Sequence, residues 1–153
     1  MKKLDEKEYI NMLEYFCFQR LRSKSQIFQD LFVLYFTGFK KNGFFLDIGA
    51  GDGVNISNTF ILEKNFNWNG IVCDPLPTWH KSLEKNRKCI IDKRCVYKSS
   101  NLEMIFEDCY KCPEVSGLKD ELEIDHNHIL RKDTRSLKVK TVSINDLLEE
   151  NNA

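Results

Sequence analysis

The chain has 153 residues, with 23 basic and 23 acidic side chains, so its formal net charge at pH 7 is zero. This length supports about one domain with a sizeable core, and an apolar fraction of 42% argues against disorder. The balanced charge argues against nucleic acid and anionic membranes as partners, and no apolar run is long enough to span a bilayer.

The first 42 residues are predicted to form helices that pack on a sheet. Apolar side chains recur at helical spacing over residues 9–21. Ser23, with a glutamine three residues later, resembles a capping box for a second helix over residues 26–37. Gly38 is placed to end that helix in the left-handed conformation.

From residue 43 onward, short apolar runs alternate with helical segments. Strands are predicted at residues 44–49, 71–73 and 94–97, with helices at 56–66 and 78–86 between them, the second capped by Thr78. This alternation is typical of an α/β protein with a parallel, doubly wound sheet. The first strand is continuously apolar and flanked by glycine, which predicts burial on both faces.

The C-terminal third is less regular. A short strand is predicted at residues 104–106, followed by a polar excursion or lid over 113–135. Alternating side chains predict a strand at 138–142, and Ser143 is expected to cap a final helix over 144–150. Without internal repeats or a low-complexity linker, we expect a single domain.

A glycine-rich loop, Asp47-Ile48-Gly49-Ala50-Gly51-Asp52-Gly53, follows the first predicted strand. Glycines let the backbone turn sharply and approach a ligand closely. The carboxyl ends of parallel strands are where open α/β sheets bind ligands. Asp74 ends the next strand, where an acidic side chain can accept hydrogen bonds from ribose hydroxyls.

Two cofactor classes use such a loop. A dinucleotide fingerprint needs a third small residue at position 54, but Val54 stands there. The acid at Asp47 would repel a pyrophosphate and suits an ammonium group. S-adenosylmethionine has an ammonium and no phosphate, so it is the favoured cofactor. A nicotinamide oxidoreductase, or a glycine-rich turn without a ligand, is the alternative.

The chain resembles the FkbM family of methyltransferases in several segments that occur in the family's order. They are Gly43–Gly53, Ser57-Asn58-Thr59, Leu62-Glu63, Ser25-Gln26 with Gln29-Asp30, Trp68-Asn69-Gly70 with Asp74-Pro75, Asn86-Arg87, and Val142–Leu148. Gly51 stands where the family commonly has asparagine, and Asp74 stands where glutamate is commoner. Both departures keep the chemistry, because the first restores a G-x-G-x-G pattern and the second retains a carboxylate.

The resemblance implies a Rossmann-like fold over residues 43–153 and methyl transfer from S-adenosylmethionine to a hydroxyl oxygen. The acceptor would be a sugar, a glycan or a small metabolite. No catalytic residue is assigned. The residues expected to bind the cofactor are Asp47, Gly49, Ala50, Gly51, Asp52, Gly53, Asn58, Asp74 and Pro75.

Family members continue beyond the last predicted helix into a fourth strand, which would pair with the first strand. The present sequence stops at Ala153, so it resembles the first half of the domain. We therefore expect an exposed apolar sheet edge that promotes self-association, together with weak cofactor binding. A non-catalytic binding or assembly module that retains the loop is the alternative to an enzyme.

Six cysteines without an apolar signal segment indicate free thiols in a reducing compartment, and we expect a cytoplasmic protein. Cys89, Cys95, Cys109 and Cys112 have irregular spacing for a zinc site, and no bound metal is expected. The lid offers general-base candidates, for which solvated loop residues are the favoured interpretation: Glu114, Asp125, His126 and His128.

Overall fold

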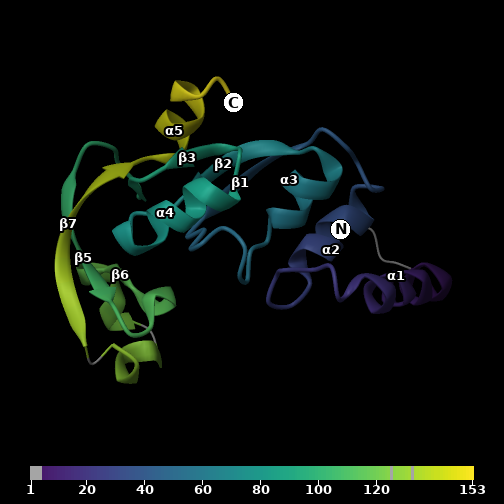
Figure 1. The fold of residues 1–153 in the computed structure, drawn as a ribbon, viewed down its shortest axis with the longest axis horizontal. Coiled ribbons are helices and arrows are strands. Elements are labelled where there is room, and N and C mark those ends of the chain that lie inside the picture. Colours follow the sequence, from purple (N-terminus) through teal and green to yellow (C-terminus); the bar gives the residue numbers. More distant parts are fainter. Residues whose placement is uncertain (1–4, 125, 132) are drawn as a thin grey trace. The chain divides into compact units, whose positions relative to one another are not determined.

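The computed structural model describes residues 5–124, 126–131 and 133–153. The chain divides into two compact units, one of Met1–Val72 with Lys81–Ile91 and the other of Cys73–His80 with Asp92–Ala153. A parallel three-stranded sheet has the order β1-β2-β3, and a curled mixed sheet has the order β4-β7-β5-β6. Figure 1 labels all of these strands except β4. The expected α/β class is therefore confirmed at this level.

Helix α1, Glu6–Gln19, begins three residues earlier than predicted because Asp5 forms a capping box with Glu8. Helix α2, Gln29–Phe36, begins three residues later than predicted. Its N-cap is Phe28, whose left-handed φ of 63° interrupts the expected helix.

The expected capping role of Ser23 is wrong. Its hydroxyl donates instead to the buried carboxylate of Asp30, at 2.6 Å. At the other end of α2, Gly38 has a φ of 62°, which confirms the predicted left-handed C-terminus.

The parallel sheet consists of β1 (Phe44–Ile48), β2 (Asn69–Cys73) and β3 (Ile90–Asp92). Strand β2 is central and almost entirely buried, as predicted. Burial of β1 on both faces is wrong, because Phe44 and Ile48 are 46% and 50% exposed.

The third strand of this sheet is β3 at Ile90–Asp92, not the predicted residues 94–97. Within that predicted range, Cys95–Val96 forms β4, which pairs parallel with β7 in the other sheet. A strand's partner is chosen by tertiary pairing, which local apolar patterning does not encode.

The helices that connect the parallel strands are shorter or shifted relative to the predictions. Helix α3 is Phe60–Phe66, and Ile56 lies before it in a left-handed conformation. Helix α4, Pro77–Asn86, begins with proline, which suits the first helical turn. Thr78 is therefore inside α4 and does not precede it as a cap.

The core of the first unit joins α2 and α3 to the sheet. Leu34, Val72 and Leu83 are fully buried, and Leu31 and Phe45 belong to the same cluster. Burial of each large apolar side chain contributes about 1.5–3 kcal/mol, so this cluster holds the base of the glycine-rich loop in place.

The second unit is built on two long antiparallel strands, β5 (Glu103–Cys109) and β7 (Thr134–Val142). Their register runs from Glu103 opposite Lys140 to Cys109 opposite Thr134. Both strands are longer than predicted because cross-strand pairs extend the ladder, including an ion pair between Glu103 and Lys138 at 2.6 Å.

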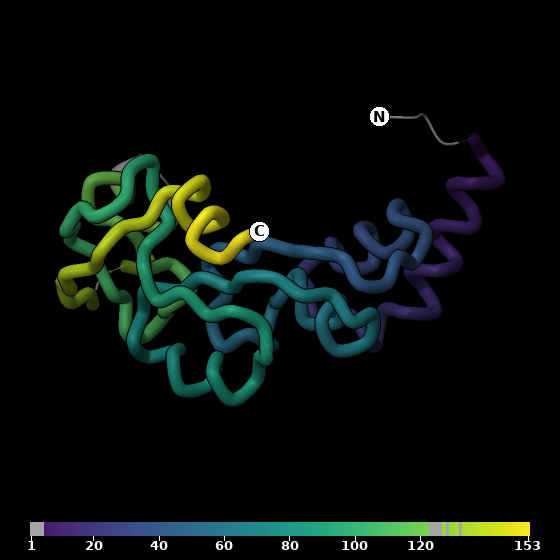
Figure 2. The backbone as a smooth tube through the Cα atoms, turned by 90° about the horizontal axis from the view of Figure 1, so that it is seen from above, coloured from purple at the N-terminus to yellow at the C-terminus, as the bar shows by residue number. Residues whose placement is uncertain are grey.

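Short elements complete this unit. They are the 3-10 helices Pro113–Val115, Lys119–Ile124 and His126–Ile129, and β6 at Gly117–Leu118. Strand β7 leads into α5, Ile144–Glu150, drawn in yellow in Figure 2. Ser143 caps α5 by accepting a hydrogen bond from the Asp146 N–H, which confirms that prediction. Among the described residues, no helix has the length and apolar character needed to cross a membrane.

The position of β1 at the sheet edge leads to a test of self-association. We expect the chain to self-associate with rising concentration, and Phe44→Lys to weaken that association because a charge on an edge strand opposes pairing with another strand. The measurement is sedimentation velocity over a concentration series.

Ile105→Lys is the matched control. Ile105 is 38% exposed, but its strand, β5, is flanked by β7 and β6. Equal effects of the two substitutions, or a wild-type chain that stays monomeric at every concentration, would rule out association through β1.

Candidate functional site

Asp47 lies near the carboxyl end of β1, immediately before the glycine-rich loop. Its Oδ2 accepts a hydrogen bond of 2.5 Å from the Thr59 hydroxyl, while Oδ1 has no hydrogen-bond partner among the described residues. Burial raises the pKa of Asp47, and the Thr59 hydrogen bond and the charge of Arg87 offset only part of that rise. The carboxylate is thus fixed through one oxygen and available through the other.

The loop after Asp47 has a backbone that only glycine adopts easily. Gly49, Gly51 and Gly53 have φ values of 77°, 56° and 80°. A Cβ at Gly49 or Gly51 would meet no atom within 4 Å, so these two positions border open space. A ligand can approach the backbone there, whereas the third glycine is needed for a different reason.

A Cβ at Gly53 would lie 2.7 Å from Cγ of Arg87 and 2.8 Å from a methyl carbon of Leu83. Glycine at this position lets α4 pack directly against the loop. The Asn86 side-chain amide adds a hydrogen bond of 2.9 Å to the carbonyl of Asp52. The C-terminal end of α4 therefore holds the loop at two consecutive residues.

The carboxylate of Asp52 is engaged by the loop's own backbone. It accepts hydrogen bonds of 2.8 Å from the N–H groups of Val54 and Asn55, and the Asn55 side chain adds another at 2.6 Å. Asp52 closes the turn in this structure, and its predicted contact with the cofactor stays a prediction.

The fully buried guanidinium of Arg87 connects the loop to α3. Its Nε donates to Glu63 at 2.6 Å, and its terminal nitrogens donate to the Gly53 carbonyl at 3.3 Å and to the hydroxyls of Ser57 and Thr59 at 3.4 and 3.0 Å. Burial alone would raise the pKa of Glu63, but the hydrogen bonds from Arg87 and Lys88 bring it below its usual value.

Arg87 also determines how Thr59 is used. The Thr59 hydroxyl accepts from the Arg87 guanidinium, so its single proton is directed to Asp47. A chain of two hydrogen bonds, from Arg87 through Thr59, therefore orients the Asp47 carboxylate. The buried positive charge also favours the ionised form of Asp47.

The other predicted ligands of the first unit differ in exposure. Ala50 is 5% exposed and belongs to the core, so its side chain serves packing. Asn58 is exposed on the segment that leads into α3. Any contact these residues make with a cofactor stays a prediction.

Asp74 directly follows β2 and is 5% exposed. Its Oδ1 accepts a hydrogen bond of 2.9 Å from the Leu76 N–H, and its carbonyl lies 3.0 Å from Nε2 of His80. Pro75 is half-buried beside it. The carboxylate therefore stabilises the turn into α4 as well as being the predicted ribose ligand.

The six cysteines, all within the described residues, form no disulfide bond. Burial raises the pKa of Cys89 to about 12 and that of Cys95 to about 11, so both thiols stay protonated near neutral pH. Over the residues that the structure describes, no group of three or more His, Cys, Asp or Glu side chains is arranged to hold a metal ion.

Of the predicted lid bases, Glu114 is exposed on the first 3-10 helix. Asp125 lies outside the described residues, as do the side chains of His126 and His128. No acid–base role is assigned to any of the four residues.

The sequence-based reasoning missed the residues that hold the loop. Thr59, Glu63 and Arg87 were included in the family resemblance, but no role was derived for them. The available signal was a serine-threonine segment and a lone Asn-Arg pair at the end of a helix, which local patterns do not connect.

No protein-family model, curated protein or solved structure matches this chain. Function must therefore be inferred from the geometry and charge of the loop itself.

Replacing Arg87 tests its importance for the first unit. We expect Arg87→Gln to lower the free energy of unfolding by about 3–5 kcal/mol, because it deprives the nearly buried Glu63 carboxylate of its only fully buried cationic partner among the described residues. Lys64→Gln removes the more exposed partner of the same carboxylate and should cost about 0–1 kcal/mol. Urea denaturation of the three proteins measures the difference, and similar losses for both variants would contradict the assignment.

Proposed function

We propose that the chain binds S-adenosylmethionine at the loop from Gly49 to Gly53 and that it is a methyltransferase of the FkbM type. The observation that carries the proposal is the fixed carboxylate of Asp47 beside three left-handed glycines. One carboxylate oxygen is held by Thr59, and the other is left to pair with a ligand cation. The amino group of S-adenosylmethionine is such a cation.

The charge of Asp47 also discriminates between cofactors. A carboxylate at this position repels the pyrophosphate of a dinucleotide, which needs N–H donors and a favourable helix dipole. The loop offers open space beside Gly49 and Gly51, where a ligand can lie against the backbone. These two features support S-adenosylmethionine over NAD.

The parallel order β1-β2-β3 supports a Rossmann-like arrangement for this part of the chain. In open α/β sheets, ligands bind outside the carboxyl ends of the strands. Asp47 and the loop lie at the carboxyl end of β1, and Asp74 follows β2 directly in the sequence. We assign Asp74 to the ribose hydroxyls on this positional ground.

The bound cofactor would supply an electrophilic methyl group on its sulfonium. The chain's own residues would bind and orient the reactants and exclude water, which accounts for much of the acceleration in such displacements. Asp47 would hold the amino-acid end of the cofactor, while Arg87 would favour the ionised form of Asp47 and orient its carboxylate through Thr59. The acceptor is a hydroxyl on a sugar or small metabolite, as the family resemblance implies.

Asp47→Asn tests the ammonium contact. We expect the variant to bind S-adenosylmethionine more weakly by about 1.5–3 kcal/mol, the scale of a charge-assisted hydrogen bond, as measured by isothermal titration calorimetry. Glu14→Gln removes an exposed carboxylate elsewhere in the same unit and should leave affinity unchanged. Tighter binding of NAD than of S-adenosylmethionine by the wild type would refute the cofactor assignment.

The raised pKa of Asp47 gives this experiment a second readout. Cofactor affinity should fall as the pH decreases through that raised pKa, because the neutral acid cannot pair with an ammonium. A carboxyl group whose pKa is higher in the folded state than in the unfolded state stabilises the folded protein at low pH, where the group is protonated. That contribution is lost as the pH rises through the folded-state pKa. Asp47→Asn should therefore not destabilise the free protein at pH 7, and a large loss of stability would show that the carboxylate is structural.

Asp74→Asn tests the ribose contact while leaving an oxygen for the Leu76 N–H. We expect weaker binding of both S-adenosylmethionine and adenosine by about 1.5–3 kcal/mol, because both ligands carry the ribose hydroxyls. If Asp74→Asn binds both ligands as tightly as the wild type does, Asp74 is not part of the site.

Cofactor binding without turnover of any hydroxyl acceptor would favour the non-catalytic module over the enzyme.

A further inference from the structure

A cavity of about 360 Å³ lies in the first unit, among α1, α2 and α3. Its apolar wall includes Leu31 and Leu34 of α2 and Ile61 of α3, all buried in the core. The rings of Tyr15 and Phe39 form another wall and meet edge to face, with centroids 4.9 Å apart. This volume lies at the lower end of the range for small-molecule sites, about 300–1,000 Å³.

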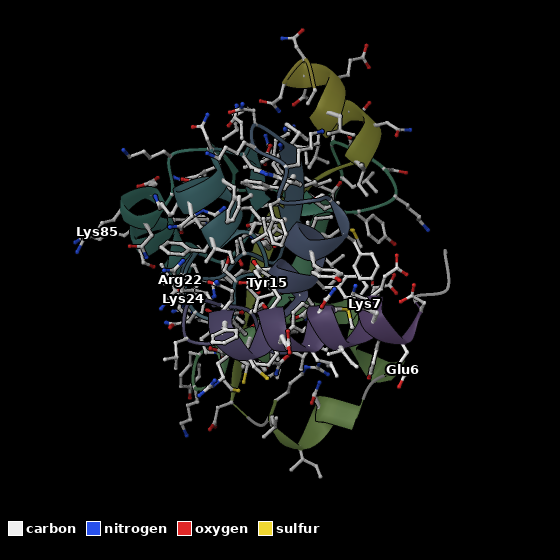
Figure 3. The ribbon with its side chains drawn as sticks, turned by 90° about the vertical axis from the view of Figure 1, so that its right-hand side faces the viewer. Glu6, Lys7, Tyr15, Arg22, Lys24 and Lys85 are labelled. Atoms are coloured by element: carbon white, nitrogen blue, oxygen red, sulfur yellow. The ribbon has the colours of Figure 1, made fainter. Side chains whose placement is uncertain are left out.

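Polar side chains join this apolar lining. Among the described residues that line the cavity, Arg22 is the only charged one, and Gln19 and Asn65 add two amides. In the described part of the chain, no hydrogen bond or ion pair engages the side-chain nitrogens of these three residues. Figure 3 shows Tyr15 on α1 and Arg22 on the segment after it. An apolar pocket with a few convergent polar groups is the usual composition of a ligand site.

Asp30 is the acidic residue whose charge acts on the cavity lining at Tyr15. Asp30 is fully buried, and its carboxylate accepts hydrogen bonds from the hydroxyls of Ser23 and Ser25 at 2.6 and 2.7 Å and from the N–H of Lys24 at 3.1 Å. Burial, followed by the charge of Asp30, raises the pKa of Tyr15, and the charge of Arg22 offsets a smaller part of that rise. The Tyr15 hydroxyl therefore keeps its proton and can donate to a ligand.

We infer that this cavity binds a small monocarboxylate with an apolar body, with the carboxylate at Arg22 and the apolar body against Leu34, Ile61 and Phe39. Arg22, Tyr15 and the two amides can all donate hydrogen bonds, and a carboxylate is an acceptor-only head group. The guanidinium of Arg22 suits a carboxylate through its planar pair of donors. No residue of the glycine-rich loop lines the cavity, so this site is independent of the proposed cofactor site.

Three ligands of the same shape separate the charge from the apolar body. They are 3-phenylpropanoate, 3-phenylpropan-1-ol and 3-phenylpropylammonium, each titrated into the full chain and followed by methyl NMR. We expect the carboxylate to bind most tightly and to shift the methyl signals of Leu31, Leu34 and Ile61. The methyl signals of Val142 and Leu147, in the second unit, serve as the internal reference.

Arg22→Gln should weaken binding of the carboxylate about fivefold, because an exposed guanidinium makes a modest charge-assisted contact, and should leave binding of the alcohol unchanged. Lys85→Gln removes a cation that does not line the cavity and should change neither affinity. Unchanged alcohol binding also shows that the cavity is intact in the variant.

Two outcomes would overturn the inference. One is the absence of shifts at the cavity methyls with millimolar carboxylate. The other is equal affinity of the wild type for the carboxylate and the alcohol, which would make the cavity a purely apolar site. Binding of S-adenosylmethionine has no bearing on either outcome, so this test and that of the cofactor site fail separately.

Discussion

The buried guanidinium of Arg87 is the contact on which the first unit depends most. A charge with no exposure to solvent is costly unless its donors are satisfied, and Arg87 satisfies them with a carboxylate, a carbonyl and two hydroxyls. These partners come from α3 and from the loop that precedes it. The same side chain also lies over the ring of Phe45, 5.3 Å from its centroid. One residue thereby ties the end of α4, the loop and β1 together.

This contact determines the shape of the loop at Gly53 and the orientation of the Asp47 carboxylate beside it. Gly53 must lack a side chain because Arg87 and Leu83 occupy the space beside it, whereas Gly49 and Gly51 border open space. Thr59, held by Arg87, directs its proton to Asp47 and so fixes the orientation of the carboxylate. Gly53 is therefore required for packing, whereas Gly49 and Gly51 are the glycines at which the proposed ligand would approach the backbone.

Helix α3 is shared by the two proposed ligand sites of this unit. Thr59, at its N-terminal end, contacts Asp47, while Ile61 and Asn65 line the cavity. Glu63, between them, pairs with Arg87. The helix is short, but its ends are constrained by these contacts and by the burial of Ile61 and Leu62. The two proposed ligands, one binding through an ammonium group and the other through a carboxylate, would thus pair with opposite charges, Asp47 and Arg22, placed around one helix.

Local patterns in the sequence determined the α/β class, the positions of β1 and β2, the left-handed end of α2 at Gly38 and the capping of α5 by Ser143. Each depends on neighbouring residues through apolar runs, positive φ or capping hydrogen bonds, so a short window is enough. Only the tertiary structure decided that Ile90–Asp92, rather than the residues around Cys95, completes the parallel sheet, because strand pairing joins distant segments. It also decided that Arg87 holds the loop, since the guanidinium finds partners 24 to 34 residues away in the chain, where no local pattern connects them.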